Sequence, residues 1–201
     1  MEMAAYRLLY DNIHDFKTTA VHFESEIKRY GICSDSEEDV PDMKGRKHMD
    51  MWASMKTVSH FNLGIAMELM LKLLLYLNKT DPAKLPKGKE RHFLTKLHDA
   101  IPKTYRGQLE STFQASRSVL PSGYQLIAFI NTSLPTSLPP PQSRDISSLR
   151  GFFEYFDEDM RWWQKRYSWE LIDQGYWRHY LSDISVFVEL INRVMRDIER
   201  Y

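Results

Sequence analysis

The sequence predicts an all-α protein, an up-and-down helical bundle of four to six helices that forms a single domain over residues 1–201. The stretch 59–78, SHFNLGIAMELMLKLLLYLN, is apolar on nearly every face of a helix, so other helices must bury it. Residues 1–30 and 176–201 carry apolar side chains at steps of three and four, which is the spacing of amphipathic helices. No alternation of apolar and polar residues is long enough to predict a sheet.

The composition sets limits on partners and compartment. The 27 Lys and Arg residues balance the 27 Asp and Glu residues, so any preference for nucleic acid must come from a local patch. The single cysteine, Cys33, excludes an internal disulfide and fits a reducing compartment. Residues 1–20 lack a basic start followed by an apolar run, so we expect no secretory signal and a cytoplasmic protein.

Two long helices are predicted in the first half of the chain. The first occupies residues 1–30, and residues 31–49, with their run of acidic side chains, are predicted to be a loop. Asp50 is the expected N-cap of a second helix, which continues through 59–78 and ends near Asn78 or Lys79, before the breakers Asp81-Pro82. We expect the two helices to pack antiparallel.

The polar residues of the stretch 59–78 form one stripe, because His60, Gly64, Glu68 and Lys72 are spaced by four. Glu68 and Lys72 can pair along the helix, and their charges near its centre favour a bundle over a membrane span. The stripe is interpreted either as a structural ion pair or as a polar pocket open to a ligand or a second subunit. The candidates for that pocket are His60, Glu68, Lys72 and His92.

Four further helices are predicted in the rest of the chain. A short one follows Arg91 and stops at Pro102, and another covers residues 104–117, with Gly107 inside it. Residues 118–144 are rich in proline, so we expect a long excursion with one short apolar piece at 125–130 and a loop at 131–144. Asp145 or Ser147 is expected to cap the next helix, which extends to residue 163, and the last helix begins near residue 176.

The segment GIAMELMLKLLLYLN, followed by a polar loop and RHFLTKLHDAI, resembles the HEPN superfamily of helical nucleotide-binding domains. In that superfamily a leucine-rich helix contains Glu-Leu-x-Leu-Lys, which Glu68 to Lys72 match. A later Gly-His-Asp-Leu element is matched through His92, with Arg91 in place of glycine and Phe93 in place of aspartate. The resemblance covers roughly residues 50–200, including KRYSWE and the long helix after it.

This resemblance implies a four- or five-helix bundle, often dimeric and frequently encoded in prokaryotic toxin–antitoxin, phage-defence or CRISPR systems. It also implies, for many members, a metal-independent ribonuclease whose active site is an Arg followed after four to six residues by a His. That pair usually lies on a late helix where two subunits meet. Here the late Arg178 and His179 are adjacent, so this part of the chain departs from the pattern.

Two other segments have the required spacing, Arg7 to His14 and Arg91 to His98. We take Arg91 and His98 as the catalytic candidates, because a separation of seven places them on one helix face beside a lysine-rich loop. The imidazole would move the 2′-hydroxyl proton, and the guanidinium would stabilise the charge that develops on phosphate. The alternative is that both are solvent-facing helix residues.

Cations alternate with aromatic side chains between residues 161 and 179. Single-stranded RNA is bound by such a combination, through base stacking and phosphate pairing. The candidates for these contacts are Arg161, Trp163, Lys165, Arg166 and Tyr167. The same composition also suits a helix-to-helix corner with buried tryptophan, or a subunit interface.

We interpret the chain as an HEPN-like binding module that interacts with RNA or a nucleotide in a prokaryotic defence or toxin–antitoxin system, and we expect a homodimer. One alternative is a metal-independent endoribonuclease, and another is a structural subunit that binds a protein partner and no nucleic acid. We expect no cofactor and no membrane association. No metal site is predicted, because the sequence has no His-Glu-x-x-His and no paired cysteines.

Overall fold

The computed structural model describes residues 2–29, 43–117, 126–130, 147–159, 176–180 and 183–199. The α-helices of these residues are α1 (Glu2–Arg29), α2 (Met43–Leu77), α3 (Leu94–Ala100), α4 (Lys103–Arg117), α5 (Leu149–Glu154) and α6 (Asp183–Ile198). Shorter elements are the 3-10 helices η1 (Pro82–Lys84) and η2 (Gly88–His92), the π-helical turn η3 (Tyr155–Asp159), and the strands β1 (Leu126–Ile130) and β2 (Tyr176–Tyr180). The predicted all-α bundle is confirmed.

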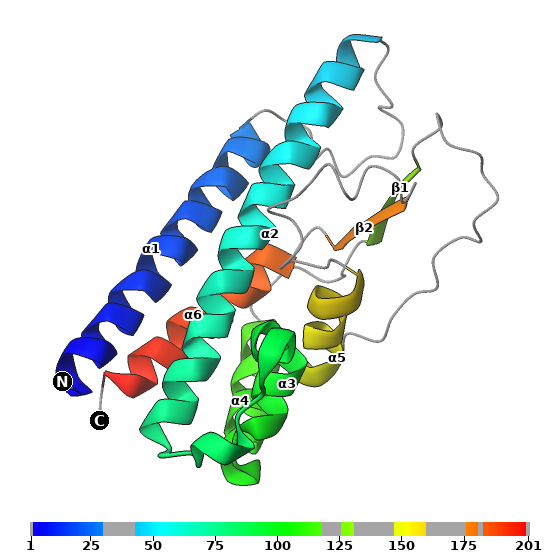
Figure 1. Cartoon of the computed structure of the whole chain (residues 1–201). Helices are drawn as coiled ribbons and strands as arrows, with labels where there is room; N and C mark the ends of the chain where they lie inside the picture. The colour runs from blue at the N-terminus through cyan, green and yellow to red at the C-terminus, as the bar shows by residue number, and fades with distance from the viewer. Residues whose placement is uncertain are drawn as a thin grey trace.

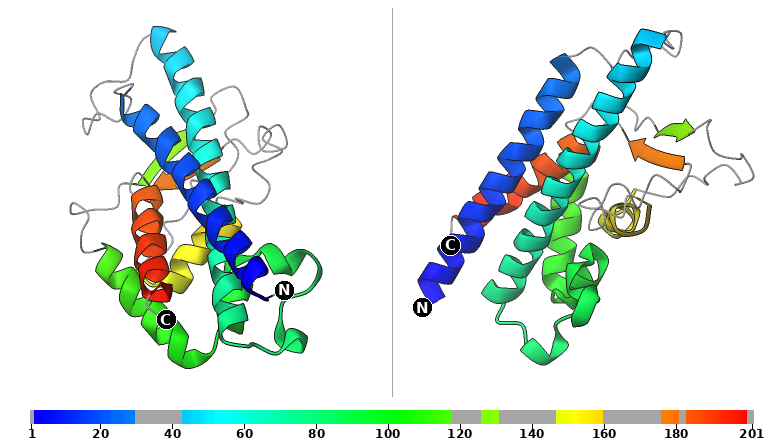
Figure 2. Two further views of the ribbon diagram at one scale, coloured as in Figure 1. Left: turned by 90° about the vertical axis from the view of Figure 1, so that its left-hand side faces the viewer. Right: turned by 45° about the horizontal axis from the view of Figure 1, so that its top comes forward.

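The helices are arranged around α2 (Figure 1). Helix α1 lies along α2 in the opposite direction, as predicted, and α6 packs against α1, α2 and α4. Helices α3 and α5 contact each other, and α3 also contacts α2 (Figure 2). The connection from α2 to α4, which contains η1, η2 and α3, therefore lies at one end of the bundle.

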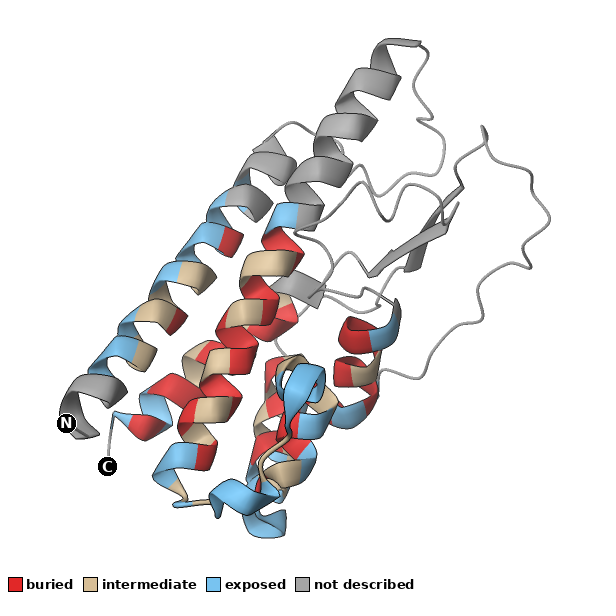
Figure 3. Ribbon diagram, in the orientation of Figure 1, coloured by how far each residue is buried: buried red, intermediate tan, exposed pale blue. Residues whose placement is uncertain are grey.

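The stretch 59–78 is the centre of the core, as its composition predicted. Many of its apolar side chains, among them Leu63, Met67 and Leu71, are fully buried, and α2 carries the longest run of buried residues in Figure 3. Among the residues of α1 whose burial is described, Ile13 and Ala20 are buried; they are seven positions apart and so lie on one face. These stripes provide the apolar contact that holds α1 on the bundle.

Within the described residues, Val58–Leu77 is long and apolar enough to cross a membrane by length and composition. Such a test is also passed by the core helix of a helical bundle, and 61% of this stretch is buried against other parts of the protein. Length and composition alone therefore give weak evidence for a span.

Helix α2 ends in a Schellman motif at the predicted place. The amide of Thr80 donates to the carbonyl of Leu75, and the amide of Lys79 donates to that of Tyr76, both at 3.0 Å. Lys79 has φ 47°, the left-handed conformation in which a Cβ is strained. The position is one that glycine usually occupies.

Replacing Lys79 with glycine should therefore raise the free energy of unfolding by about 0.5 to 1 kcal/mol, because glycine adopts this conformation without strain. Urea denaturation measures the change, and Lys79→Ala is the control, since it removes the charge and keeps the Cβ. A gain for alanine as large as that for glycine would show that charge, and not backbone strain, limits stability here.

Some predicted helix boundaries are wrong. Helix α2 begins at Met43 and not after an N-cap at Asp50, so residues 43–49 of the predicted loop 31–49 are helical. Once a helix has formed, each further residue adds one backbone hydrogen bond, so the helix can extend through residues that lack an apolar spacing. The cap of α5 is Ser148, whose hydroxyl accepts from the amide of Gly151 at 3.0 Å, and not Asp145 or Ser147. Residues 31–42 and 131–144 lie outside the described part of the chain.

The expectation that no sheet forms is also wrong. Strand β1 lies in the predicted short apolar piece and pairs antiparallel with β2, from Leu126 opposite Tyr180 to Ile130 opposite Tyr176. Residues 176–180 were expected to open the last helix, whereas α6 starts at Asp183. Their sequence, YWRHY, is aromatic and suits a strand, and pairing with a distant segment outweighs the local helical spacing.

Candidate functional site

Three of the four polar-pocket candidates meet in one cluster, which we call the Glu68 cluster (Glu68, Lys72, Arg91 and His92). The Glu68 side chain is buried on α2, and Lys72, one turn later, donates to its Oε1, as the spacing predicted. His92, at the end of η2, places Nδ1 at 3.1 and 3.2 Å from the two carboxylate oxygens. An ammonium and an imidazole thus offset the cost of burying this carboxylate.

The contact with Arg91 assigns the donor and acceptor roles of the two His92 ring nitrogens. Arg91 Nε donates to His92 Nε2 at 3.0 Å, so Nε2 holds a lone pair and the ring proton is on Nδ1. Nδ1 therefore donates to Glu68, and the side chains form a chain from guanidinium through imidazole and carboxylate to ammonium. The side chains of His92 and Lys72 are 41% and 34% exposed, so the cluster is open to solvent on one side.

His60, the fourth candidate, lies outside this cluster. It is fully buried two helical turns before Glu68, and its ring centroid is 5.5 Å from that of Phe156. A spacing of four aligns residues only over one or two turns, because each step of four overshoots a full turn. The predicted stripe is therefore divided: Glu68 and Lys72 contact each other, whereas His60 packs in the core.

The predicted catalytic pair does not share a helix face. Arg91 is exposed in η2, whereas His98 is buried in α3, and between them Phe93 has an extended backbone with ψ 122°. The His98 ring packs edge-on against Phe153, with the centroids 5.5 Å apart. His98 is thus a core residue, which also contradicts the alternative of a solvent-facing histidine.

Burial lowers the pKa of His98 below its ordinary value of 6.5, because the charged imidazolium loses its hydration there. The unfolded chain then binds the proton more strongly than the folded protein does. The contribution of His98 to stability is therefore fully present above pH 6.5 and is lost as the pH falls through this value towards the lower, folded-state pKa.

We accordingly expect the free energy of unfolding to fall as the pH is lowered below 6.5, and the fall to be smaller in His98→Leu. Leucine fills much of the same space, and neither ring nitrogen of His98 has a hydrogen-bond partner among the described residues. Urea denaturation at a series of pH values measures both proteins. Parallel pH profiles of wild type and variant would show that His98 does not carry this dependence.

The helix that contains His98 is capped by a distant residue, Asp157 of η3. The Phe93 side chain makes no capping bond, and the Asp157 carboxylate accepts instead from the amides of Leu94 and Thr95, at 3.0 and 2.8 Å. It also accepts from the Thr95 hydroxyl at 2.7 Å. Asp157 is itself buried, so this contact fixes where η2 and α3 lie relative to the core.

The connection between α2 and α4 is strongly cationic, and we call residues 79–103 the cationic connection. It holds seven Lys and Arg residues against three Asp and Glu residues in a chain with no net charge. All seven cations are exposed, namely Lys79, Lys84, Lys87, Lys89, Arg91, Lys96 and Lys103. Sequence reasoning noted the lysine-rich loop, and the structure joins it to the Glu68 cluster through Arg91 and His92.

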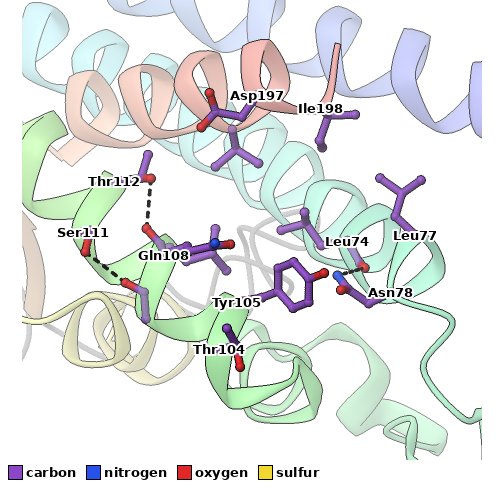
Figure 4. Close-up of a pocket in the computed structure, with 13 residues that line it drawn as sticks. Leu74, Leu77, Asn78, Thr104, Tyr105, Gln108, Ser111, Thr112, Asp197 and Ile198 are labelled. Carbon is purple, nitrogen blue, oxygen red and sulfur yellow. Dashed lines mark hydrogen bonds between the residues drawn. The ribbon is translucent and has the colours of Figure 1, made fainter. Parts of the chain in front are cut away.

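A pocket of about 1050 Å³ lies between the end of α2, the first half of α4 and the end of α6 (Figure 4). Its apolar side chains include Leu74, Leu109 and Ile198, and its polar ones include Asn78, Tyr105 and Gln108. The sequence analysis did not identify it, because three segments without a shared motif form it. The feature that points to the pocket is the exposed side chain of Tyr105, and its exposure is known only from the structure.

The other predicted site residues are placed as follows. The candidates for RNA contacts between Arg161 and Tyr167 lie outside the described residues. Of the remaining Arg and His pair, Arg7 is exposed and His14 is partly buried on α1, with Nδ1 3.2 Å from Lys17 Nζ. In the described part of the chain, no group of three His, Cys, Asp or Glu side chains lies close enough to hold a metal ion.

Comparison with protein-family models, with curated proteins and with solved structures finds no match to this chain.

Proposed function

We propose that this protein is an HEPN-like binding module that interacts with RNA or a nucleotide through the cationic connection, in a prokaryotic defence or toxin–antitoxin system. The observation that carries this proposal is the set of seven exposed cations that residues 79–103 place at one end of the bundle, in a chain without net charge. Lys and Arg side chains attract the phosphate groups of nucleic acid, and the attraction depends on their local density.

The Glu68 cluster supports the same proposal. The two sequence elements that carry the resemblance, Glu68 to Lys72 and the segment at His92, are joined by hydrogen bonds between Glu68 and His92. This bond holds η2 against α2, so the cations of the connection are presented on an ordered backbone. A surface that is ordered before binding loses less conformational entropy when the ligand binds.

Neutralising two cations of the connection, in Lys84→Gln/Lys87→Gln, should lower the affinity for single-stranded RNA by about ten-fold and reduce its salt dependence. The matched control is Arg7→Gln/Arg196→Gln, which removes the same charge from exposed positions on α1 and α6. Fluorescence anisotropy with a labelled mixed-sequence RNA measures both variants and the wild type. An equal loss in the two variants would mean that binding follows total charge and not the connection.

The endoribonuclease is the second candidate, and the Glu68 cluster favours it with His92 in place of His98. For the lone pair on His92 Nε2 to accept the 2′-hydroxyl proton, Arg91 must leave it for the phosphate, while Glu68 orients the ring through Nδ1. Arg91, which is within hydrogen-bond distance of Nε2, would stabilise the charge on phosphate. Cleavage of RNA in EDTA that is lost in His92→Ala and retained in His98→Leu would support this candidate, and no cleavage by the wild type would exclude it.

A further inference from the structure

The pocket of Figure 4 has an apolar interior and a small number of uncommitted polar groups. The hydroxyls of Ser111 and Thr112 already donate to carbonyls of their own helix, at 3.1 and 3.0 Å. By contrast, the Tyr105 hydroxyl and the side-chain amide of Gln108 form no hydrogen bond with other described residues. These groups are therefore available to a ligand.

Asn78 adds an acceptor of fixed orientation. Its Nδ2 donates to the carbonyl of Leu74 at 2.7 Å, which leaves Oδ1 as the acceptor of this side chain. Figure 4 shows the Tyr105 ring extending toward Asn78, with Gln108 one turn further along α4. A planar ligand with hydrogen-bonding edges can thus lie against the Tyr105 ring and reach amide groups at its rim.

Charge decides which part of a ligand the pocket accepts. Of the described residues that line it, Asp197 is the one with a charged side chain, so a phosphate inside the pocket would face this carboxylate. The cations lie at its margins: Lys79 follows Asn78 in the chain, Lys103 precedes Thr104, and both are exposed. The arrangement suits a molecule with an uncharged ring and an anionic group outside it.

We propose that this pocket binds the base of a nucleotide, with Tyr105 as the stacking surface and Gln108 and Asn78 as the groups that contact the base edge. The phosphate then lies outside, next to Lys79 or Lys103. Amide side chains form hydrogen bonds with base edges, and aromatic side chains stack on the faces of bases. This inference rests on the proposed function, because it places the base of the same ligand whose phosphates contact the cationic connection.

The test is calorimetric titration of the protein with adenosine, guanosine, cytidine and uridine, and then with their 5′-monophosphates. We expect at least one nucleoside to bind with an affinity that is independent of salt, and its monophosphate to bind more tightly at low salt. Tyr105→Ala should weaken nucleoside binding by about five- to 150-fold, the measured range for loss of one stacking contact. Gly107→Leu should also weaken it, since this lining residue has open space around its Cβ position and folding should be unaffected.

The matched control is Tyr76→Ala, because Tyr76 is 43% exposed against 44% for Tyr105 and does not line the pocket. Equal losses in the two tyrosine variants would overturn the placement in the pocket. If no nucleoside or monophosphate binds at millimolar concentration while RNA still binds to the cationic connection, this inference fails and the proposed function stands. If a nucleoside binds with the expected loss in Tyr105→Ala and RNA does not bind, the base site is supported and the cationic connection loses its assigned role.

Discussion

Phe187→Ala should lower the free energy of unfolding by about 3 to 5 kcal/mol, the usual cost of removing a fully buried phenylalanine side chain. Phe187 is 0% exposed on α6, and its ring centroid lies 4.3 Å from those of Phe152 and Phe156. Alanine would leave a cavity at the place where α6 meets α5 and η3. Since α6 also contacts α1, α2 and α4, the loss would affect the whole bundle.

Urea denaturation of the purified variant measures this loss, and Leu8→Ala is its control. Leu8 is 63% exposed on α1, so its removal should change stability by less than about 0.5 kcal/mol. A loss below about 1 kcal/mol for Phe187→Ala would contradict the close packing of this aromatic cluster.

Asp157→Ala should cost about 3 kcal/mol, because it leaves the amides of Leu94 and Thr95 without their charged acceptor. Hydrogen exchange of these two amides should become faster, as the first turn of α3 loses its cap. Asp157→Asn should lower the free energy of unfolding by less than Asp157→Ala does, since one carbonyl oxygen remains to accept a hydrogen bond.

The control for Asp157 is Asp81→Ala. Asp81 also caps a helix, by accepting from the amide of Ala83 at 2.9 Å in η1, and it is exposed. Its loss should cost about 0.5 to 1 kcal/mol, because water can satisfy the amide that it leaves. If the two variants lose the same stability, the buried cap does not position η2 and α3 as we infer.

Local spacing predicted the helices well because their apolar stripes follow the helical period. It located α1 and the end of α2, and the steps of four within 59–78 predicted the contact of Lys72 with Glu68. His92 was named as a candidate for the polar pocket, but spacing could not predict its contact with Glu68, because 24 positions separate the two residues.

The features that were missed depend on contacts between distant segments. The cap of α3 comes from Asp157, 62 and 63 positions after the amides it accepts from, and no helix-start signal reports such a partner. For the same reason β2 was expected to be helical, since its partner β1 lies about fifty residues earlier in the chain. His98 was taken as a catalytic candidate, with a solvent-facing position as the alternative, because periodicity alone does not show which face of a seven-residue helix is covered.

The most direct test of the central claim is the affinity of the wild-type protein for single-stranded RNA, measured between about 50 and about 200 mM NaCl. If the cationic connection binds phosphates, the logarithm of the binding constant should fall linearly with the logarithm of salt concentration, with a slope of about −0.7 for each phosphate neutralised. Three or more contacts would give a slope of about −2 or steeper. Absence of binding at the lowest salt concentration, or an affinity that does not change with salt, would contradict the proposed function.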